Sequence, residues 1–470
     1  MEKNATGSGA GGSGREMLGS RLGFLLLSAG CAIGLGNVWR FPFITGAYGG
    51  AIFGHVYVFV LDAIPPIMIM EFAVGRASRL NMGLALRKLE PAGTSWHRFG
   101  WVALVGSYLL MMFYTTVTGW MLSYCWFEIS GALSGLSPEG VGAFFSAALG
   151  SAGTQVAGMT VAVALGFAVC AMGVRRGVER VVKGMMLGLL LILLILVVRA
   201  LLLPDAGSGV RFYLMPDWEN FREVGFFNVC NAAMGQAFFA LSVGIGSMTI
   251  FGSYQPKDRS LSGEALWIMG LDTTVGLMAG LIIFPACFSF GVAPGSGPGL
   301  VFVTLPNIFN HMEAGRLWGA LFFVFLAFAS LSTVIAVFEN IISYSVDVWG
   351  MPRRRATALH TAVMWLMSLP CALGFNLLSG VQPLGAGSTI LDFEDFLVSN
   401  NVLPLGGLLF LFFCCWRRGW GWDNFLHEAD QGDGLKFPRC LRFYLTWLLP
   451  CLILILFAAG YADRFYATNP

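Results

Sequence analysis

The stretch from Ser28 to Pro42 reads Ser-Ala-Gly-Cys-Ala-Ile-Gly-Leu-Gly-Asn-Val-Trp-Arg-Phe-Pro. It lies in an apolar run that could cross a membrane, yet three glycines interrupt it, and Asn37 and Arg40 stand near its end. Glycine destabilises a helix interior, and polar or charged side chains within a span usually mark a functional site. The stretch therefore predicts a broken membrane helix that carries an ion and solute site.

The composition places this helix in a polytopic membrane protein. Hydrophobic residues make up 56% of the 470 residues and charged residues 11%, whereas charged residues make up about 25% of a soluble domain. A membrane helix needs roughly 20 mainly apolar residues. About eleven such spans are predicted, with starts near Leu22, Ala51, Trp101, Val156, Val181, Phe226, Leu261, Leu317, Ala358, Pro404 and Leu441. The fold class is therefore all-α.

The basic residues predict the orientation, because Lys and Arg in short loops favour the cytoplasmic side. They gather in alternate loops, at residues 76–98, 175–183, 257–259, 353–355 and 417–442. We expect a cytoplasmic N-terminus, an external C-terminus and a place in the plasma or bacterial inner membrane. The Gly- and Ser-rich residues 1–14 lack the apolar core of a signal peptide. The net charge of +2 is spread over these loops, so no nucleic-acid partner is expected.

A second glycine-interrupted span lies five spans after the first. It contains Gly235, Gly244 and Gly246 around Ser242. Such a pair at corresponding positions in two halves indicates a transporter site built on inverted repeats. Close helix packing is the alternative for any one glycine, but polar Asn37 and Ser242 beside the breaks favour the site. Unwound backbone offers carbonyls to Na⁺ and N–H groups to a carboxylate.

These breaks suggest a division of the chain into two repeats. The predicted parts are a flexible tail (1–20), a first repeat (21–204), an external loop (205–221), a second repeat (222–420), a cytoplasmic loop (421–435) and a last helix with the C-terminus (436–470).

The motif at residues 30–42, followed by Gly49-Gly50, resembles the first helix of the neurotransmitter:sodium symporters, in particular their bacterial amino-acid transporter branch. The resemblance continues through residues 235–242, 331–333 and 391–396 and covers nearly the whole chain. It implies a five-plus-five inverted repeat with broken helices 1 and 6. Many family members have a twelfth helix, which this chain is predicted to lack.

The resemblance implies two sodium sites made of oxygen ligands, which suit a hard cation. The second site would use carbonyls and hydroxyls of Gly30, Ile33, Ala329, Ser332 and Thr333. For the two hydroxyls, bonding back to helix carbonyls is the alternative. The first site would use Ala32, Asn37, Ala240, Asp272 and the carboxylate of the substrate.

The first sodium site departs from the family pattern. Ala240 stands where relatives usually have Ser or Thr, and Asp272 where they often have Asn. In chloride-dependent relatives the anion lies near positions matching Tyr57, Gln236, Ala240, Asp272 and Gly276. Here two hydroxyls are missing and a carboxylate would repel the anion. We therefore expect no chloride requirement, with Asp272 supplying the negative charge; a structural role at a helix end is the alternative.

The resemblance also implies the substrate class. Monoamine transporters have an Asp at the position of Gly34, whereas glycine leaves room for a substrate carboxylate, which favours an amino acid. Tyr114 matches a tyrosine that binds this carboxylate, and Phe239 an aromatic that closes the pocket. The expected contacts are Ala32, Gly34, Leu35, Gly36, Leu110, Tyr114, Phe239, Ala240, Ser242, Ile245, Thr333 and Val337. This largely apolar set favours a larger hydrophobic or aromatic side chain.

Charged residues at the span ends match the gates of the family. Arg40 and Asp395 would form the outer pair, and Arg15 and Asp347 the inner pair. Glu71 resembles a glutamate that braces the broken first helix, and Glu339 is another candidate brace. His55 and Asp62 have no counterpart in the pattern.

The sequence thus predicts a sodium-coupled amino-acid symporter that works by alternating access. A transporter of another small carboxylate-bearing amine, a non-transporting amino-acid sensor on the same fold and a substrate-gated channel remain alternatives. An enzyme is not expected, because no nucleophile–base pair or metal-ligand cluster is found, and the ten cysteines lack metal-ligand spacing. The sequence does not indicate an oligomeric state.

Overall fold

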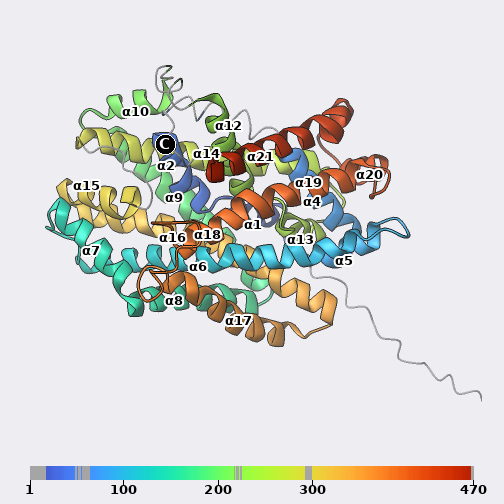
Figure 1. Cartoon of the computed structure of the whole chain (residues 1–470), viewed down its shortest axis with the longest axis horizontal. Helices are drawn as coiled ribbons and strands as arrows, with labels where there is room; N and C mark the ends of the chain where they lie inside the picture. The colour runs from blue at the N-terminus through green and yellow to red at the C-terminus, as the bar shows by residue number, and fades with distance from the viewer. Residues whose placement is uncertain are drawn as a thin grey trace, which may run out of the picture.

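The helices of this chain run mainly along the long axis of the molecule, with α5 and α20 at one end and α7 and α15 at the other (Figure 1). The computed structural model describes residues 17–47, 50, 54, 64–215, 218, 222, 225–291 and 299–466. In these residues the regular secondary structure is helical, apart from isolated β-bridge positions such as the pair Arg259 and Asp433. The predicted all-α class is confirmed.

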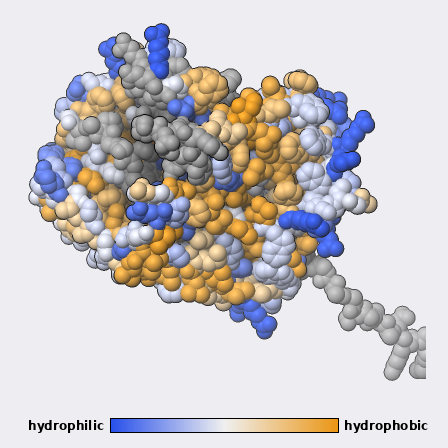
Figure 2. Space-filling view, in the orientation of Figure 1, coloured by the Kyte–Doolittle hydropathy of each residue, from blue (hydrophilic) through white to orange (hydrophobic). Residues whose placement is uncertain are grey.

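Eight described helical segments are long and apolar enough to cross a membrane. Their main helices are α6 (Phe99–Ser130), α8 (Ala152–Ala171), α9 (Arg180–Leu201), α14 (Leu261–Ser289), α16 (Gly315–Trp349), α17 (Arg353–Leu373), α18 with α19 (Ile390–Leu397 and Leu403–Cys415) and α21 (Leu449–Tyr466). Helices α6 and α16 are mostly buried and form the core, whereas most residues of α9 and α21 are only partly buried or exposed. Hydrophobic residues dominate the middle of the face in Figure 2, and hydrophilic ones gather toward its ends, as expected of a chain surrounded by lipid.

The remaining predicted spans correspond to shorter helices. The second is α4 (Pro65–Ser78), and its predicted start at Ala51 lies outside the described residues. The tenth begins at Ile390 rather than near Pro404. Its acidic first turns lower the local hydropathy, but Thr389 caps the helix through a reciprocal pair of hydrogen bonds with Asp392, and a π-helical segment, η5 (Val398–Val402), joins its halves.

Both predicted breaks are present. Helix α1 (Arg21–Ala32) ends at Ile33, and the chain resumes in a π-helical segment, η1 (Gly36–Arg40), and α2 (Phe41–Ala47). In the sixth span, α12 (Phe226–Ala240) and α13 (Ser247–Ser253) are separated by an irregular segment. Gly244 in that segment has a φ of 100°, and a Cβ there would lie 2.4 Å from the Leu403 carbonyl oxygen. Only glycine meets both conditions.

Several segments between the predicted spans were expected to be loops. In the structure they contain helices. They are α5 (Met82–Leu89), α7 (Pro138–Gly150), α10 (Ala206–Leu214), α15 (Leu305–His311) and α20 (Trp422–Ala429). Helices α10 and α20 lie in the predicted loops 205–221 and 421–435. Each of these helices is too short to span a bilayer. The fifth span starts earlier than predicted, with a π-helical segment, η3 (Val174–Glu179).

Candidate functional site

A small pocket lies where the two broken helices face α6 and α16. It is lined by Cys31, Ala32, Gly34, Gly36, Leu110, Tyr114, Phe239, Ser242, Thr333 and Leu403. All but Cys31 and Leu403 were predicted substrate contacts. The cavity has a volume of about 10 Å³, which is room for about one water molecule. Its walls must move apart before an amino acid can enter.

Four predicted substrate contacts lie beside this lining rather than on it. Leu35 donates its backbone N–H to the Tyr114 hydroxyl at 2.9 Å. Ala240 lies next to Gly36, because a Cβ on that glycine would be 3.6 Å from the Ala240 Cα. Ile245 and Val337 are fully buried and do not line the closed pocket.

Gly34 occupies the tightest part of the pocket. A Cβ at this position would lie 2.1 Å from the Tyr114 hydroxyl oxygen and 2.6 Å from the Thr333 hydroxyl oxygen. No larger residue fits without displacing those two groups. The Tyr114 hydroxyl accepts a hydrogen bond from the Leu35 backbone and lies beside the Thr333 hydroxyl, and a phenolic hydroxyl can also donate its proton to an acceptor such as a carboxylate.

The hydroxyls expected at the second sodium site lie against the end of α1. The Thr333 hydroxyl is 3.2 Å from the Gly30 carbonyl oxygen and 3.4 Å from the Ala329 carbonyl oxygen. The Ser332 hydroxyl donates to Ala329 at 2.9 Å, and Ile33 is the residue at which α1 ends. The same oxygens could surround a cation if the hydroxyl protons turned away. Ser332 bonds back to its own helix, as in the alternative interpretation, whereas the two shorter contacts of Thr333 are with carbonyls of the first span.

A second group of oxygens lies at Asn37. The Asn37 side-chain amide donates to the Asp272 carbonyl at 2.9 Å and to its carboxylate at 2.8 Å. Gln236 donates its amide to the Gly36 carbonyl at 2.7 Å. Asn37 Oδ1, Asp272 Oδ2 and Gln236 Oε1 are buried without a hydrogen-bond partner among the described residues. Buried polar atoms are nearly always paired, so three such oxygens in adjoining residues suit a cation. Ala32 and Ala240 can add only backbone oxygens.

The two residues predicted to form the outer gate are in contact beside the pocket. Arg40 and Asp395 are 3.4 Å apart, and Ser399 links them, with its hydroxyl 2.8 Å from the guanidinium and 2.7 Å from the carboxylate. The Arg40 guanidinium also lies 4.8 Å from the centre of the Phe239 ring. The pocket is therefore covered on this side.

The predicted inner gate is described only in part. Arg15 lies outside the described residues, as do His55, Tyr57 and Asp62. Asp347 accepts a hydrogen bond from the backbone of Asn81 at 2.9 Å, at the start of α5.

Both candidate braces make contacts. Glu71 accepts a hydrogen bond from the backbone N–H of Gly244, so its contact is with the broken sixth span, whereas the sequence suggested the first. Glu339 accepts from the Tyr254 hydroxyl at 2.8 Å and pairs with Arg353.

Sequence reasoning missed one polar residue beneath the pocket. Asn340 donates to the Ser107 hydroxyl at 3.1 Å and to the Ile245 carbonyl at 3.2 Å. It thereby ties α16 to the break of the sixth span. An asparagine within an apolar span is unusual enough to have drawn attention.

Known proteins with similar sequences and structures belong to one family of sodium-dependent transporters. A sequence model of the sodium:neurotransmitter symporter family matches residues 15–136 and 143–465. The chain is 34% identical over 441 residues to the uncharacterized sodium-dependent transporter YhdH of Bacillus subtilis, which covers 93% of this chain and 96% of that protein. It is 31% identical over 461 residues to an uncharacterized sodium-dependent transporter of Haemophilus influenzae, with coverages of 95% and 98%. The crystal structure of MhsT in complex with L-phenylalanine matches with 36% identity and a TM-score of 0.86, over 95% of this chain and all of that one.

Proposed function

Because the chain belongs to the sodium:neurotransmitter symporter family and is a sodium-dependent transporter rather than an enzyme, we propose that it imports a hydrophobic or aromatic L-amino acid together with Na⁺. The protein is a multi-pass membrane protein. With the basic loops on the cytoplasmic side, α5 and α20 would lie at the cytoplasmic end and the Arg40–Asp395 pair at the external end.

The pocket carries the substrate proposal. At one end of the pocket the hydroxyls of Tyr114 and Thr333 lie so close to Gly34 that no room is left for the Asp that would receive a monoamine. The other walls include the apolar side chains of Leu110, Phe239 and Leu403. This combination suits a carboxylate at one end of the ligand and an apolar side chain at the other. The L-phenylalanine in the MhsT complex supports the same class.

We further propose two sodium sites. The second would lie between the end of α1 and the hydroxyls of Ser332 and Thr333, and the first among the unpaired oxygens of Asn37, Asp272 and Gln236. A tenfold Na⁺ gradient contributes about 1.4 kcal/mol, and a charge crossing 100 mV about 2.3 kcal/mol. One Na⁺ could thus drive roughly 500-fold accumulation of a zwitterion, and two roughly 10⁵-fold.

Transport would not require chloride. Asp272 is fully buried and hydrogen-bonded to Asn37, so a carboxyl group, which is ionised when a cation binds beside it, stands at the position that an anion would occupy. A Cβ on Gly276 would lie 3.7 Å from the Asn37 amide nitrogen, so a hydroxyl-bearing side chain there would have faced the same place.

Uptake into proteoliposomes tests these proposals together. Labelled phenylalanine, leucine, tryptophan and glycine would be compared, with external Na⁺ replaced by choline and Cl⁻ by gluconate in turn. We expect saturable, Na⁺-dependent uptake of the hydrophobic amino acids that gluconate leaves unchanged. A preference for glycine would contradict the substrate class, and loss of uptake in gluconate would contradict the role of Asp272. Binding without uptake would favour the sensor alternative.

A further inference from the structure

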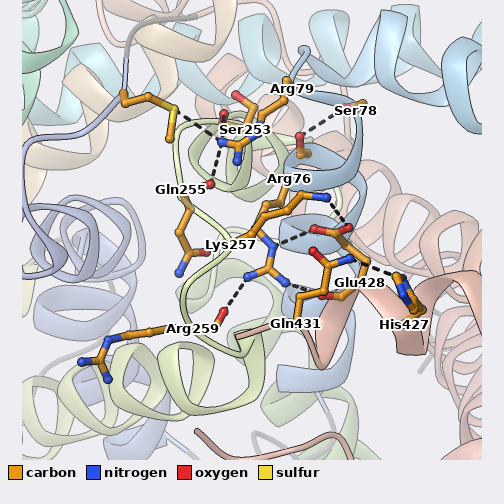
Figure 3. A network of polar contacts seen from close by, with 12 residues as sticks. Arg76, Ser78, Arg79, Ser253, Gln255, Lys257, Arg259, His427, Glu428 and Gln431 are labelled. Carbon is orange, nitrogen blue, oxygen red and sulfur yellow. Dashed lines mark hydrogen bonds and ion pairs between the residues drawn. The ribbon is translucent and has the colours of Figure 1, made fainter. Parts of the chain in front are cut away.

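Arg76, in the last turn of α4, is a fully buried arginine that does not line the pocket. Its Nε atom is 2.8 Å from the carboxylate of Glu428 on α20, and one terminal nitrogen is 2.6 Å from the carbonyl oxygen of Arg259. The other terminal nitrogen donates to the Glu428 backbone carbonyl. Figure 3 shows the guanidinium enclosed between these two segments. A buried charge this well paired is costly to separate from its partners.

Helix α4 is also in direct contact with α13, the inner half of the broken sixth span. A Cβ on Gly75 would lie 1.8 Å from the Thr249 carbonyl oxygen, and one on Gly252 would lie 2.4 Å from the Phe72 carbonyl oxygen. The two backbones therefore touch at two places along their length. Small residues that allow such contact are typical of tightly associated membrane helices.

A side chain of α4 and the side chain of its C-cap residue hold the two ends of α13. Glu71 accepts the N–H of Gly244, just before α13 begins. Arg79 donates to the carbonyls of Ser253 and Gln255, at 3.2 and 2.6 Å, where α13 ends. An acidic group near a helix N-terminus and a basic group at the C-terminus both complement the helix dipole.

The loop after α13 is joined to the chain that follows α20. The Asp433 backbone N–H donates to the Asp258 carbonyl at 2.8 Å, and the Asp433 carbonyl accepts from the Ser260 N–H at 3.0 Å. These two hydrogen bonds make the isolated bridge between Asp433 and Arg259. A Cβ on Gly432 would lie 2.2 Å from the Arg259 backbone nitrogen. Here too the backbones are in contact.

We propose that Arg76 is a positioning residue that joins α4, α13 and residues 421–437 into one body, which we call the Arg76 joint. Helix α13 follows directly on the break that contains Ser242, part of the pocket wall. Residues 421–437 therefore move together with the pocket wall at Ser242 during transport. Loosening the Arg76 joint weakens the binding of Na⁺ and amino acid. The inference requires transport by this chain, and its assay uses the amino-acid uptake proposed above.

The first test is a set of charge-removing variants. Glu428→Gln leaves the buried Arg76 without its carboxylate, whereas Arg76→Gln/Glu428→Gln removes both charges. Lys257→Gln is the matched control, because Lys257 binds the same carboxylate at 3.0 Å but its side chain is 43% exposed. Breaking a buried pair is much more costly than removing both charges or an exposed partner.

We expect Glu428→Gln to raise both the phenylalanine KM and the half-saturating Na⁺ concentration at least about fivefold, with a smaller change in kcat. Lys257→Gln should stay within about twofold of the parent, and the double variant should lie closer to the parent than Glu428→Gln does. Rates are normalised to the amount of folded protein. Equal effects of Glu428→Gln and Lys257→Gln, or a fall in kcat alone, would overturn the proposal.

The second test closes the joint covalently. Arg259 and Asp433 are exposed bridge partners, and paired strands are about 4.7–4.9 Å apart, within the range that a disulfide spans. Arg259→Cys/Asp433→Cys would be made with the exposed Cys440 and Cys451 replaced by Ser. Uptake by the oxidised and the reduced forms of this one protein is then compared.

If the joint moves as one body, oxidation leaves uptake unchanged within about twofold. If oxidation stops uptake and reduction restores it, the two segments must separate during transport, and the proposal is wrong. A parent protein that takes up no phenylalanine would count against the proposed substrate instead. The oxidised and reduced forms would then be compared by flux of labelled Na⁺, with the same two outcomes.

Discussion

Asp272→Asn should weaken sodium binding more than its small change in shape suggests. In the structure the Asn37 amide donates to Asp272 Oδ1 at 2.8 Å, and Oδ2 is left without a partner among the described residues. An asparagine at 272 would keep the first contact by turning its oxygen toward Asn37. Its NH₂ group would then replace Oδ2, the atom proposed to face the cation. The variant thus loses a negative charge and also places a hydrogen-bond donor against Na⁺.

The size of the effect follows from the charge. A unit charge 4 Å from another contributes about 4 kcal/mol at an effective dielectric constant of 20. About half of this is offset, because the ion-free state of the parent already carries the cost of an incompletely paired buried carboxylate. The remaining ~2 kcal/mol corresponds to about a 30-fold increase in the half-saturating Na⁺ concentration.

The assay is the Na⁺ dependence of amino-acid uptake in proteoliposomes, with the substrate held at a saturating concentration. Asp205→Asn, an exposed aspartate just before α10, is the matched control and should leave the curve unchanged. A half-saturating Na⁺ concentration within about twofold of the parent in Asp272→Asn would refute the assignment of this carboxylate to a sodium site.

Three further predictions concern the pocket and the second sodium site. Gly34→Ala should abolish measurable uptake, because its Cβ would lie 2.1 Å from the Tyr114 hydroxyl oxygen. Gly184→Ala is the control, because the space around Gly184 is open. Normal uptake by Gly34→Ala would show that the pocket is wider than described. Tyr114→Phe should raise the amino-acid KM about tenfold or more through loss of a buried hydroxyl, and an unchanged KM would remove Tyr114 from carboxylate binding. Thr333→Val keeps the shape but loses the hydroxyl, so the Hill coefficient for Na⁺ should fall from near two toward one, if two ions are carried. Thr361→Val, whose hydroxyl only bonds back to its own helix, should retain the parent's coefficient, and an equal fall in both variants would contradict the site.

The elements that could be predicted are those set by local sequence. Hydropathy located most spans to within a few residues, and the glycines near Gly34 and Gly244 located both breaks, because glycine destabilises a regular helix in an apolar run. Helices α10 and α20 were not anticipated, since each is short and its mixed composition resembles that of a loop. The pairing of Arg76 with Glu428, 352 positions apart, could not be predicted either. It depends on how the spans are packed, and a basic residue at a span end is normally taken as solvated.

The positions of the oxygens proposed to bind Na⁺ suggest how ion binding and substrate binding could be coupled. Thr333 contacts the carbonyl of Gly30 and also lines the pocket, and Asn37 follows directly on Gly36, which lines it too. The pocket is closed to about 10 Å³ in this structure, so opening it requires free energy from a ligand. A cation that satisfies the unpaired oxygens of Asn37 on the first broken span, Gln236 on the sixth and Asp272 on α14 would hold both broken helices and α14 in place at the same time. A substrate that arrives afterwards then meets backbone that is already ordered and needs less of its own binding energy for that step, which is positive cooperativity between ion and substrate.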